Sequence, residues 1–117
     1  MSDIVRLQDD DPRMSQIVIH GGIVYLSGQV DQEATDAEGQ TKGILAKIDT
    51  LLAAAGTDKS KLISAQIWVK DISQHFKPMN KVWCAWLDPK AKPVRATVEA
   101  NLALPNLLVE IQVTCAV

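Results

Sequence analysis

The sequence predicts an α+β fold in which two helices pack on one face of a mixed β-sheet. Two amphipathic segments have helical periodicity, and segments rich in β-branched residues flank and separate them. The expected order is strand, strand, helix, strand, helix, strand, strand. With 117 residues, of which 47% are hydrophobic and 22% charged, the chain has the size and composition of one folded domain. We therefore expect residues 1–117 to form a single unit.

Two short strands are expected at residues 16–19 (QIVI) and 23–27 (IVYLS), joined by a tight turn. Gly21 and Gly22 lie between them, and glycine readily takes the positive φ angles that such turns require. His20 precedes both glycines and is interpreted as a turn residue, not a catalytic one. These residues predict a β-hairpin.

The first helix is expected to begin near Thr35, because Thr35-Asp36-Ala37-Glu38 has the spacing of a capping box. Its apolar stripe consists of Ile44, Leu45, Ile48, Leu51, Leu52 and Ala55. Gly56 follows this stripe directly and is the expected C-terminal stop.

A third strand is expected at residues 62–70, with one face formed by Ile63, Ala65, Ile67 and Val69. A second helix should run from about Phe76 to Leu87, because Pro78 suits a helix only in its first turn. Its stripe comprises Phe76, Met79, Asn80, Trp83, Trp86 and Leu87. A buried amide without partners costs roughly 1–3 kcal/mol. Asn80 is therefore either a structural clamp on nearby backbone or part of a site.

Two final strands are expected at residues 93–99 (PVRATVE) and 108–117 (LVEIQVTCAV). The last strand has an apolar face of Val109, Ile111, Val113, Cys115 and Val117. Two helices cover only one face of such a sheet. The uncovered face is expected to carry Arg95, Thr97, Glu110, Gln112 and Thr114, together with Leu62, Trp68 and Leu108. We expect this face to pack against further copies of the chain, with sites in the resulting clefts.

Arg95 and Glu110 are the two residues of that expected face that are best suited to binding a ligand or moving a proton. An arginine presents a rigid fork of donors that matches a carboxylate, and a nearby acid can orient or deprotonate a water molecule. The residues alone leave a second interpretation open, in which Arg95 forms a cross-strand ion pair with Glu110 or Glu99.

Charge and residue spacing weigh against other classes of protein. The formal net charge is −2 and the basic residues do not cluster, so nucleic-acid binding is not expected. Cys84 and Cys115 lack CxxC spacing and are interpreted as reduced, mostly buried thiols; with His20 and His75 isolated, no metal site is expected. Residues 1–13 lack the apolar region of a signal peptide, and no apolar run is long enough to span a membrane. A cytoplasmic location is expected.

Several segments, in matching order, resemble the Rid family of reactive intermediate deaminases, also called the RidA/YjgF family. The most specific are PVRATVE at residues 93–99 and Val109-Glu110-Ile111. Further matches are Ser27-Gly28-Gln29, Val69-Lys70-Asp71, and Phe76 with Met79-Asn80. The resemblance covers essentially the whole chain. It implies a chorismate mutase-like fold assembled as a homotrimer, with three sites between subunits.

The resemblance also implies an activity that needs no cofactor, the hydrolysis of enamines and imines such as 2-aminoacrylate and its imino tautomer to 2-keto acids and ammonia. Arg95 matches the family's carboxylate-binding arginine, and Glu110 matches the acid near the attacking water. Asn80 and Gly28 match residues that line the pocket. A second function stays open on the same fold, in which the protein binds 2-keto acids or related metabolites without turning them over.

At two pocket positions the sequence departs from the pattern of many family members. Met14 stands where many have a tyrosine, and Thr97 where many have a cysteine. Both are counted among the expected substrate-binding residues. Because Arg95 and Glu110 are retained, hydrolysis is the expected chemistry, with a substrate preference that differs from the prototype.

Overall fold

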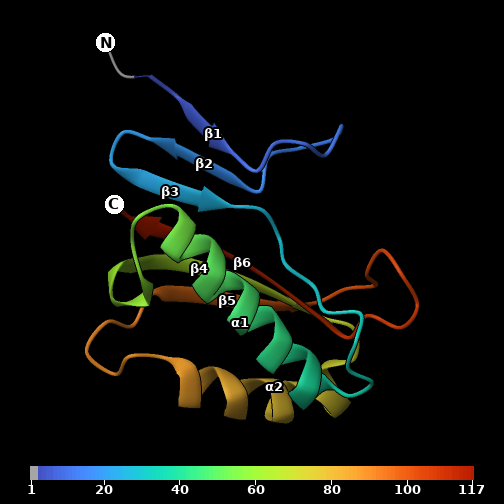
Figure 1. Cartoon of the computed structure of the whole chain (residues 1–117). Helices are drawn as coiled ribbons and strands as arrows, with labels where there is room; N and C mark the ends of the chain where they lie inside the picture. Colours follow the sequence, from blue (N-terminus) through green and yellow to red (C-terminus); the bar gives the residue numbers. More distant parts are fainter. Residues whose placement is uncertain (1–2) are drawn as a thin grey trace.

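The computed structural model describes residues 3–117, which form six strands, two α-helices and one short 3₁₀ helix (Figure 1). In chain order these are β1 (Val5–Leu7), β2 (Ile17–His20), β3 (Ile23–Leu26), α1 (Ala37–Ala54), η1 (Lys59–Lys61), β4 (Leu62–Val69), α2 (Ile72–Trp86), β5 (Val94–Glu99) and β6 (Val109–Ala116). The predicted order of elements is confirmed. β1 is an additional strand that was not predicted, and it pairs with β2.

The six strands form one mixed sheet in the order β1-β2-β3-β6-β4-β5. β4 and β5 run parallel, and the other neighbouring strands run antiparallel. A parallel pair needs a long crossover connection, and α2 provides it. β1 and β5 therefore lie at opposite edges of the sheet (Figure 1).

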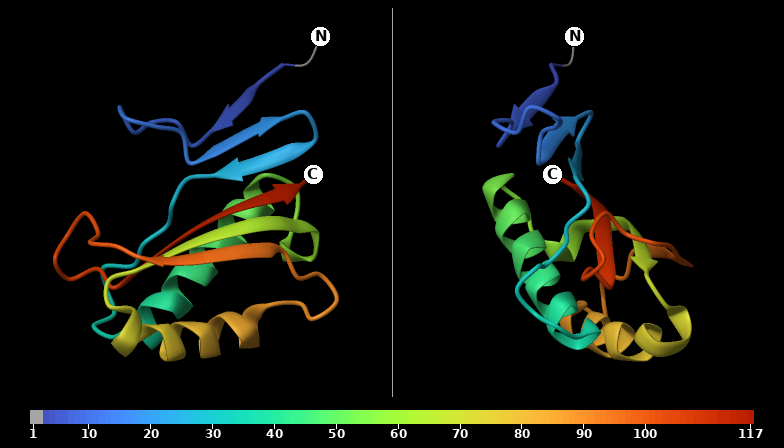
Figure 2. Two further views of the ribbon diagram at one scale, coloured as in Figure 1. Left: turned by 180° about the vertical axis from the view of Figure 1, so that it is seen from behind. Right: turned by 90° about the vertical axis from the view of Figure 1, so that its right-hand side faces the viewer.

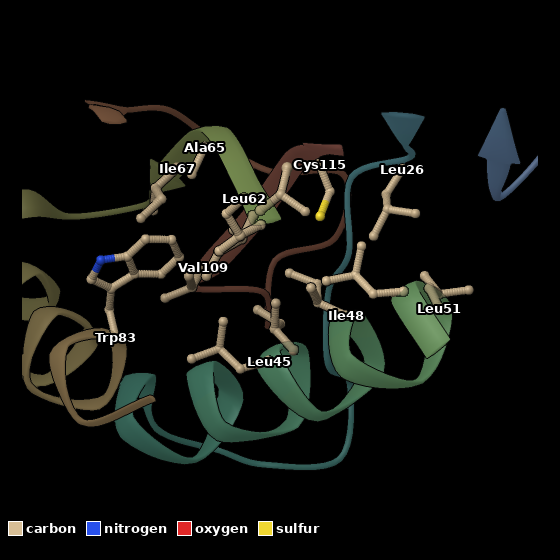
Figure 3. Close-up of a cluster of buried hydrophobic side chains, with 14 of the residues drawn as sticks. Leu26, Leu45, Ile48, Leu51, Leu62, Ala65, Ile67, Trp83, Val109 and Cys115 are labelled. Atoms are coloured by element: carbon tan, nitrogen blue, oxygen red, sulfur yellow. The ribbon is translucent and has the colours of Figure 1, made fainter. Parts of the chain in front are cut away.

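Both helices pack on one face of the sheet, as predicted (Figure 2). Leu45, Ile48 and Leu51 point from α1 toward the strands, and Trp83 enters the same core from α2 (Figure 3). The alternating residues of β6 fit this arrangement, because its apolar residues from Val109 to Cys115 are buried. We call the opposite side the uncovered face; on its central strands it carries Ser64, Gln66, Trp68, Glu110, Gln112 and Thr114.

The first helix starts slightly later than the capping-box pattern suggested. Its N-cap is Asp36, whose Oδ1 accepts a hydrogen bond from the backbone N–H of Gly39 at 2.7 Å. Thr35 lies outside the helix. The predicted stop is confirmed, because Gly56 has a φ angle of 84° and follows the end of α1.

Replacing the N-cap should therefore weaken α1. We expect Asp36→Ala to lower the free energy of unfolding by about 1 kcal/mol, because a backbone N–H loses its acceptor. The matched variant Thr35→Ala should change it by less than about 0.5 kcal/mol. Chemical denaturation measures both free energies of unfolding. A larger loss of stability for Thr35→Ala than for Asp36→Ala would mean that Thr35, as predicted from the sequence, is the N-cap.

The second helix begins at Ile72 rather than near Phe76. Asp71 is its N-cap, and the Oδ1 atom of Asp71 accepts a hydrogen bond from the N–H of Gln74 at 3.3 Å. Pro78 consequently lies beyond the first turn, where it cannot donate a hydrogen bond to the carbonyl of Gln74. Burial of Met79 and Trp83, which follow Pro78, stabilises the helix across this interruption.

Other predictions fail at the ends of elements. A bulge between Leu62 and Ser64 places Leu62 in the core and leaves Ile63, which we expected there, 41% exposed. Val117 is 51% exposed because it lies beyond the end of β6. Cys115 is buried as expected, but Cys84 is exposed on α2.

Candidate functional site

Arg95 lies on the edge strand β5 and points to the helix-covered side of the sheet. It is aligned with Ala65 of β4, which belongs to the buried core. Its Nη1 donates a hydrogen bond to Oδ1 of Asn80 on α2 at 2.7 Å. The predicted position of Arg95 on the uncovered face is therefore wrong. The same correction applies to Thr97, because residues two apart on a strand share a face.

The guanidinium of Arg95 lies against a stripe of α2. Its Cζ is 5.9 Å from the ring centre of Phe76 and 5.7 Å from that of Trp83. Asn80 lies between these two residues on the helix and contacts the side chain of Arg95 rather than the backbone. The sequence placed Phe76, Asn80 and Trp83 on one stripe but did not identify Arg95 as the partner of that stripe.

No carboxylate within residues 3–117 forms an ion pair with Arg95. Glu99, one of the two partners left open by the sequence, instead accepts a hydrogen bond from the N–H of Ile72 at 3.0 Å. A guanidinium has five N–H groups, and Asn80 accepts from one of its nitrogens. Arg95 thus keeps donors for a further acceptor.

Thr97 is the second polar side chain of β5 on this side. Its Oγ1 is buried and has no hydrogen-bond partner among the described residues. A buried hydroxyl without a partner costs roughly 1–3 kcal/mol. Arg95 and Thr97 therefore both have hydrogen-bonding capacity that the described part of the chain does not use.

Glu110 lies on β6 and points to the uncovered face, where it is aligned with Trp68. Its carboxylate packs against Gly28, and a Cβ atom at residue 28 would overlap Oε2 of Glu110. Burial raises the pKa of Glu110 above its ordinary value. Within residues 3–117 this carboxylate has no ion-pair partner.

The predicted site residues thus fall into two groups. The arginine group, Arg95 with Asn80 and Thr97, lies on the helix-covered side at β5. The glutamate group, Glu110 with Gly28, lies on the uncovered face at β6. β4 separates the two strands. Met14 belongs to neither group and is 42% exposed in the segment before β2.

The raised pKa of Glu110 has a consequence for stability. A raised pKa means that the folded protein binds this proton more tightly than the unfolded chain does. The stabilisation is full below the ordinary pKa of 4.5 and is lost as the pH rises through the folded pKa. Glu110→Gln cannot ionise, so we expect its stability relative to the wild type to increase as the pH rises from 4.5 through the folded pKa of Glu110. Denaturation at several pH values measures this difference, and a decrease with pH would contradict the desolvation of Glu110.

Two hollows bear on where a ligand could bind. One, of 450 Å³, lies over β4, β5 and β6, and its wall includes Gln66, Gln112 and one predicted site residue, Arg95. A larger one, of 670 Å³, lies between α1 and residues 8–12. The larger hollow contains none of the predicted site residues, so its size alone does not identify it as the functional site.

Residues 3–117 contain neither a membrane-spanning helix nor a cluster of metal-ligating side chains. Neither α1 nor α2 combines the length and the apolar character needed to cross a membrane. No three His, Cys, Asp or Glu side chains in this range are grouped so that they could hold a metal ion.

Comparison with known proteins gives matches over nearly the whole chain. The family model described as Endoribonuclease L-PSP matches residues 10–117. A RutC family protein of Haemophilus ducreyi is 41% identical over 106 residues, which are 90% of each chain. The RutC family protein YoaB of Escherichia coli is 40% identical over 114 residues, covering 97% of this chain and 98% of YoaB.

Solved structures agree with these matches. A member of the YjgF protein family from Neisseria meningitidis has a TM-score of 0.93 and 39% identity, over 97% of this chain and 94% of the other. A Rid family protein from Yersinia pestis has a TM-score of 0.86 and 28% identity over the full length of both chains. The resemblance found in the sequence is confirmed: the chain belongs to the Rid/YjgF family.

Proposed function

We propose that this protein hydrolyses reactive 2-imino acids and their enamine tautomers to 2-keto acids and ammonia, without a cofactor. Arg95 binds the substrate carboxylate, Glu110 moves protons, and Asn80, Gly28, Thr97 and Met14 shape the site. The observation that carries this proposal is the state of Arg95. Its guanidinium is ordered by contacts with α2, yet it has no acidic partner within residues 3–117.

The ordered guanidinium suits a small organic acid. A carboxylate can accept two parallel hydrogen bonds from an arginine, and charge-assisted bonds of this kind are about twice as strong as neutral ones. Such binding fixes the adjacent C=N carbon of a 2-imino acid relative to the protein. A water molecule held nearby is then positioned for attack, which is the contribution of proximity to the rate.

The hydrolysis balances with the protein groups available. The water oxygen forms a bond to the imine carbon, the π electrons of C=N move to nitrogen, and Glu110 accepts the water proton. Glu110 returns this proton to nitrogen, which gives a carbinolamine. Glu110 then accepts the hydroxyl proton as the C=O bond of the keto acid forms and passes it to nitrogen, so that the C–N bond breaks and ammonia leaves. A carboxyl with a raised pKa suits both accepting and donating this proton. For an enamine, a proton is first added to the β-carbon.

The separation of the two groups supports sites shared between copies of the chain. Arg95 and Glu110 point to opposite sides of the sheet, with β4 between their strands. One copy therefore does not direct both side chains toward one small ligand. We propose a homotrimer in which the arginine group of one copy meets the glutamate group of the next. A cyclic arrangement would form three equivalent sites.

An amino-acid oxidase supplies the test, because it releases 2-imino acids from amino acids with different side chains. Semicarbazide traps the imine, so we expect the protein to lower the amount of trapped imine at an unchanged rate of peroxide formation. Heat-denatured protein is the control. Saturable binding of 2-ketobutyrate with no effect on any imine would favour the function of metabolite binding and would overturn hydrolysis.

A further inference from the structure

We propose that Phe76 and Trp83 are positioning residues that hold the Arg95 guanidinium in the orientation required by a carboxylate ligand. This inference rests on the proposed function and adds to it two residues that the sequence did not assign to the site.

The contacts come from one side of α2. Phe76, Asn80 and Trp83 are spaced by four and three residues, so their side chains lie on the same side of the helix. Asn80 accepts a hydrogen bond from Nη1 of Arg95, and the two rings lie 5.9 Å and 5.7 Å from its Cζ. A guanidinium this close to an aromatic ring is attracted by the ring electrons. One helix therefore provides all three contacts.

The ring of Trp83 is itself fixed in place. Trp83 is 3% exposed, and its indole packs beside Ala65 and Ile67 of β4 (Figure 3). The ring of Trp86 lies 5.4 Å from it at a tilt of 45°. Because Trp83 belongs to the core, it cannot follow a moving guanidinium and acts as a rigid surface for Arg95.

Fixing Arg95 before the ligand arrives should strengthen binding. Arginine loses more rotamer freedom on ordering than most side chains. When Arg95 is ordered during folding, its loss of side-chain entropy does not reduce the free energy of ligand binding. Asn80 and the rings occupy part of the surroundings of the guanidinium and leave its remaining N–H groups for the ligand. The expected ligand is a planar carboxylate that accepts two of these hydrogen bonds.

The kinetic test compares Trp83→Leu with Trp86→Leu. The two tryptophans are on the same helix, but the cation that lies over Trp86 is Lys59, not Arg95. We expect Trp83→Leu to raise KM for a 2-imino acid by about 3- to 30-fold with little change in kcat, because ground state and transition state lose the same contact. Trp83→Phe should recover part of the loss. Trp86→Leu removes a neighbour of the Trp83 ring but no contact with Arg95, so it should raise KM much less than Trp83→Leu does. Phe76→Leu should also raise KM. Because Phe76 is only half-buried, this variant provides the test if Trp83→Leu does not fold.

A second measurement does not depend on activity. The chain has three arginines, Arg6, Arg13 and Arg95, so the Nε–H signal of Arg95 can be assigned in nitrogen-15 NMR spectra by substitution. We expect this N–H to be rigid in the wild type and mobile in Trp83→Leu or Phe76→Leu. If the wild type does not hydrolyse imines, the proposed function fails while this signal still tests the positioning. A signal equally rigid in wild type and both variants would overturn the inference, as would an unchanged KM in both.

Discussion

Replacing Arg95 by alanine is expected to abolish the acceleration of 2-iminopropionate and 2-iminobutyrate hydrolysis. The variant loses both hydrogen bonds to the substrate carboxylate. Hydrogen bonds to charged groups contribute roughly 1.5–3 kcal/mol each, so kcat/KM should fall by about 10²- to 10⁴-fold. The oxidase-coupled assay measures this loss after subtraction of the spontaneous reaction.

Two controls separate loss of the site from loss of the fold. Arg95→Lys keeps a positive charge but lacks the planar fork, so its activity should lie between those of the wild type and Arg95→Ala. The oligomeric state and the unfolding midpoint of Arg95→Ala should stay close to the wild type, because Arg95 lies on an edge strand and forms no ion pair within the described range. Full activity in folded Arg95→Ala would remove Arg95 from the mechanism.

Mixing two inactive variants should restore activity. In the proposed homotrimer, each site takes Arg95 from one copy and Glu110 from its neighbour. Arg95→Ala and Glu110→Gln should each be inactive alone, but every mixed ring contains one intact site. Randomly mixed rings should therefore regain about a quarter of the wild-type activity.

The two variants should be refolded together at equal amounts, so that mixed rings form. Each variant refolded alone, and the two combined after refolding, are the controls. No recovered activity in rings shown to be mixed would mean that both residues act within one copy. That result would contradict the proposed site while leaving the fold unaffected.

Local patterns predicted most of the fold. The stripe that ends at Gly56, the hairpin turn at Gly21 and Gly22, and the alternation of β6 each depend on residues close in sequence. β1 was missed because three residues carry too little pattern to show that they pair with β2. The start of α2 lies earlier than predicted, because Asp71 caps the helix and Pro78 lies beyond its first turn.

The side of the sheet on which Arg95 lies could not be predicted from the sequence pattern. Alternation correctly indicates that Arg95 and Thr97 share a face, but it does not say which face that is. The sequence analysis predicts that the side of β5 with Arg95 and Thr97 belongs to the uncovered face. Arg95 is aligned with the core residue Ala65, so it lies on the helix-covered side. This alignment exists only in the folded sheet, so the sequence of β5 does not reveal it. Asn80, a polar residue among aromatic ones, was the available sign that a charged partner lay opposite α2.

In the proposed site, the second helix links binding of the substrate carboxylate to folding. Met79 and Trp83 anchor α2 in the hydrophobic interior, while Asn80 on the same helix contacts Arg95. In the proposed site, a substitution on this helix would therefore alter both the binding of the substrate carboxylate and the packing of the core, so the two could not evolve independently. Substrate range should change more readily through positions such as Met14, whose side chain is exposed and supports no interior packing.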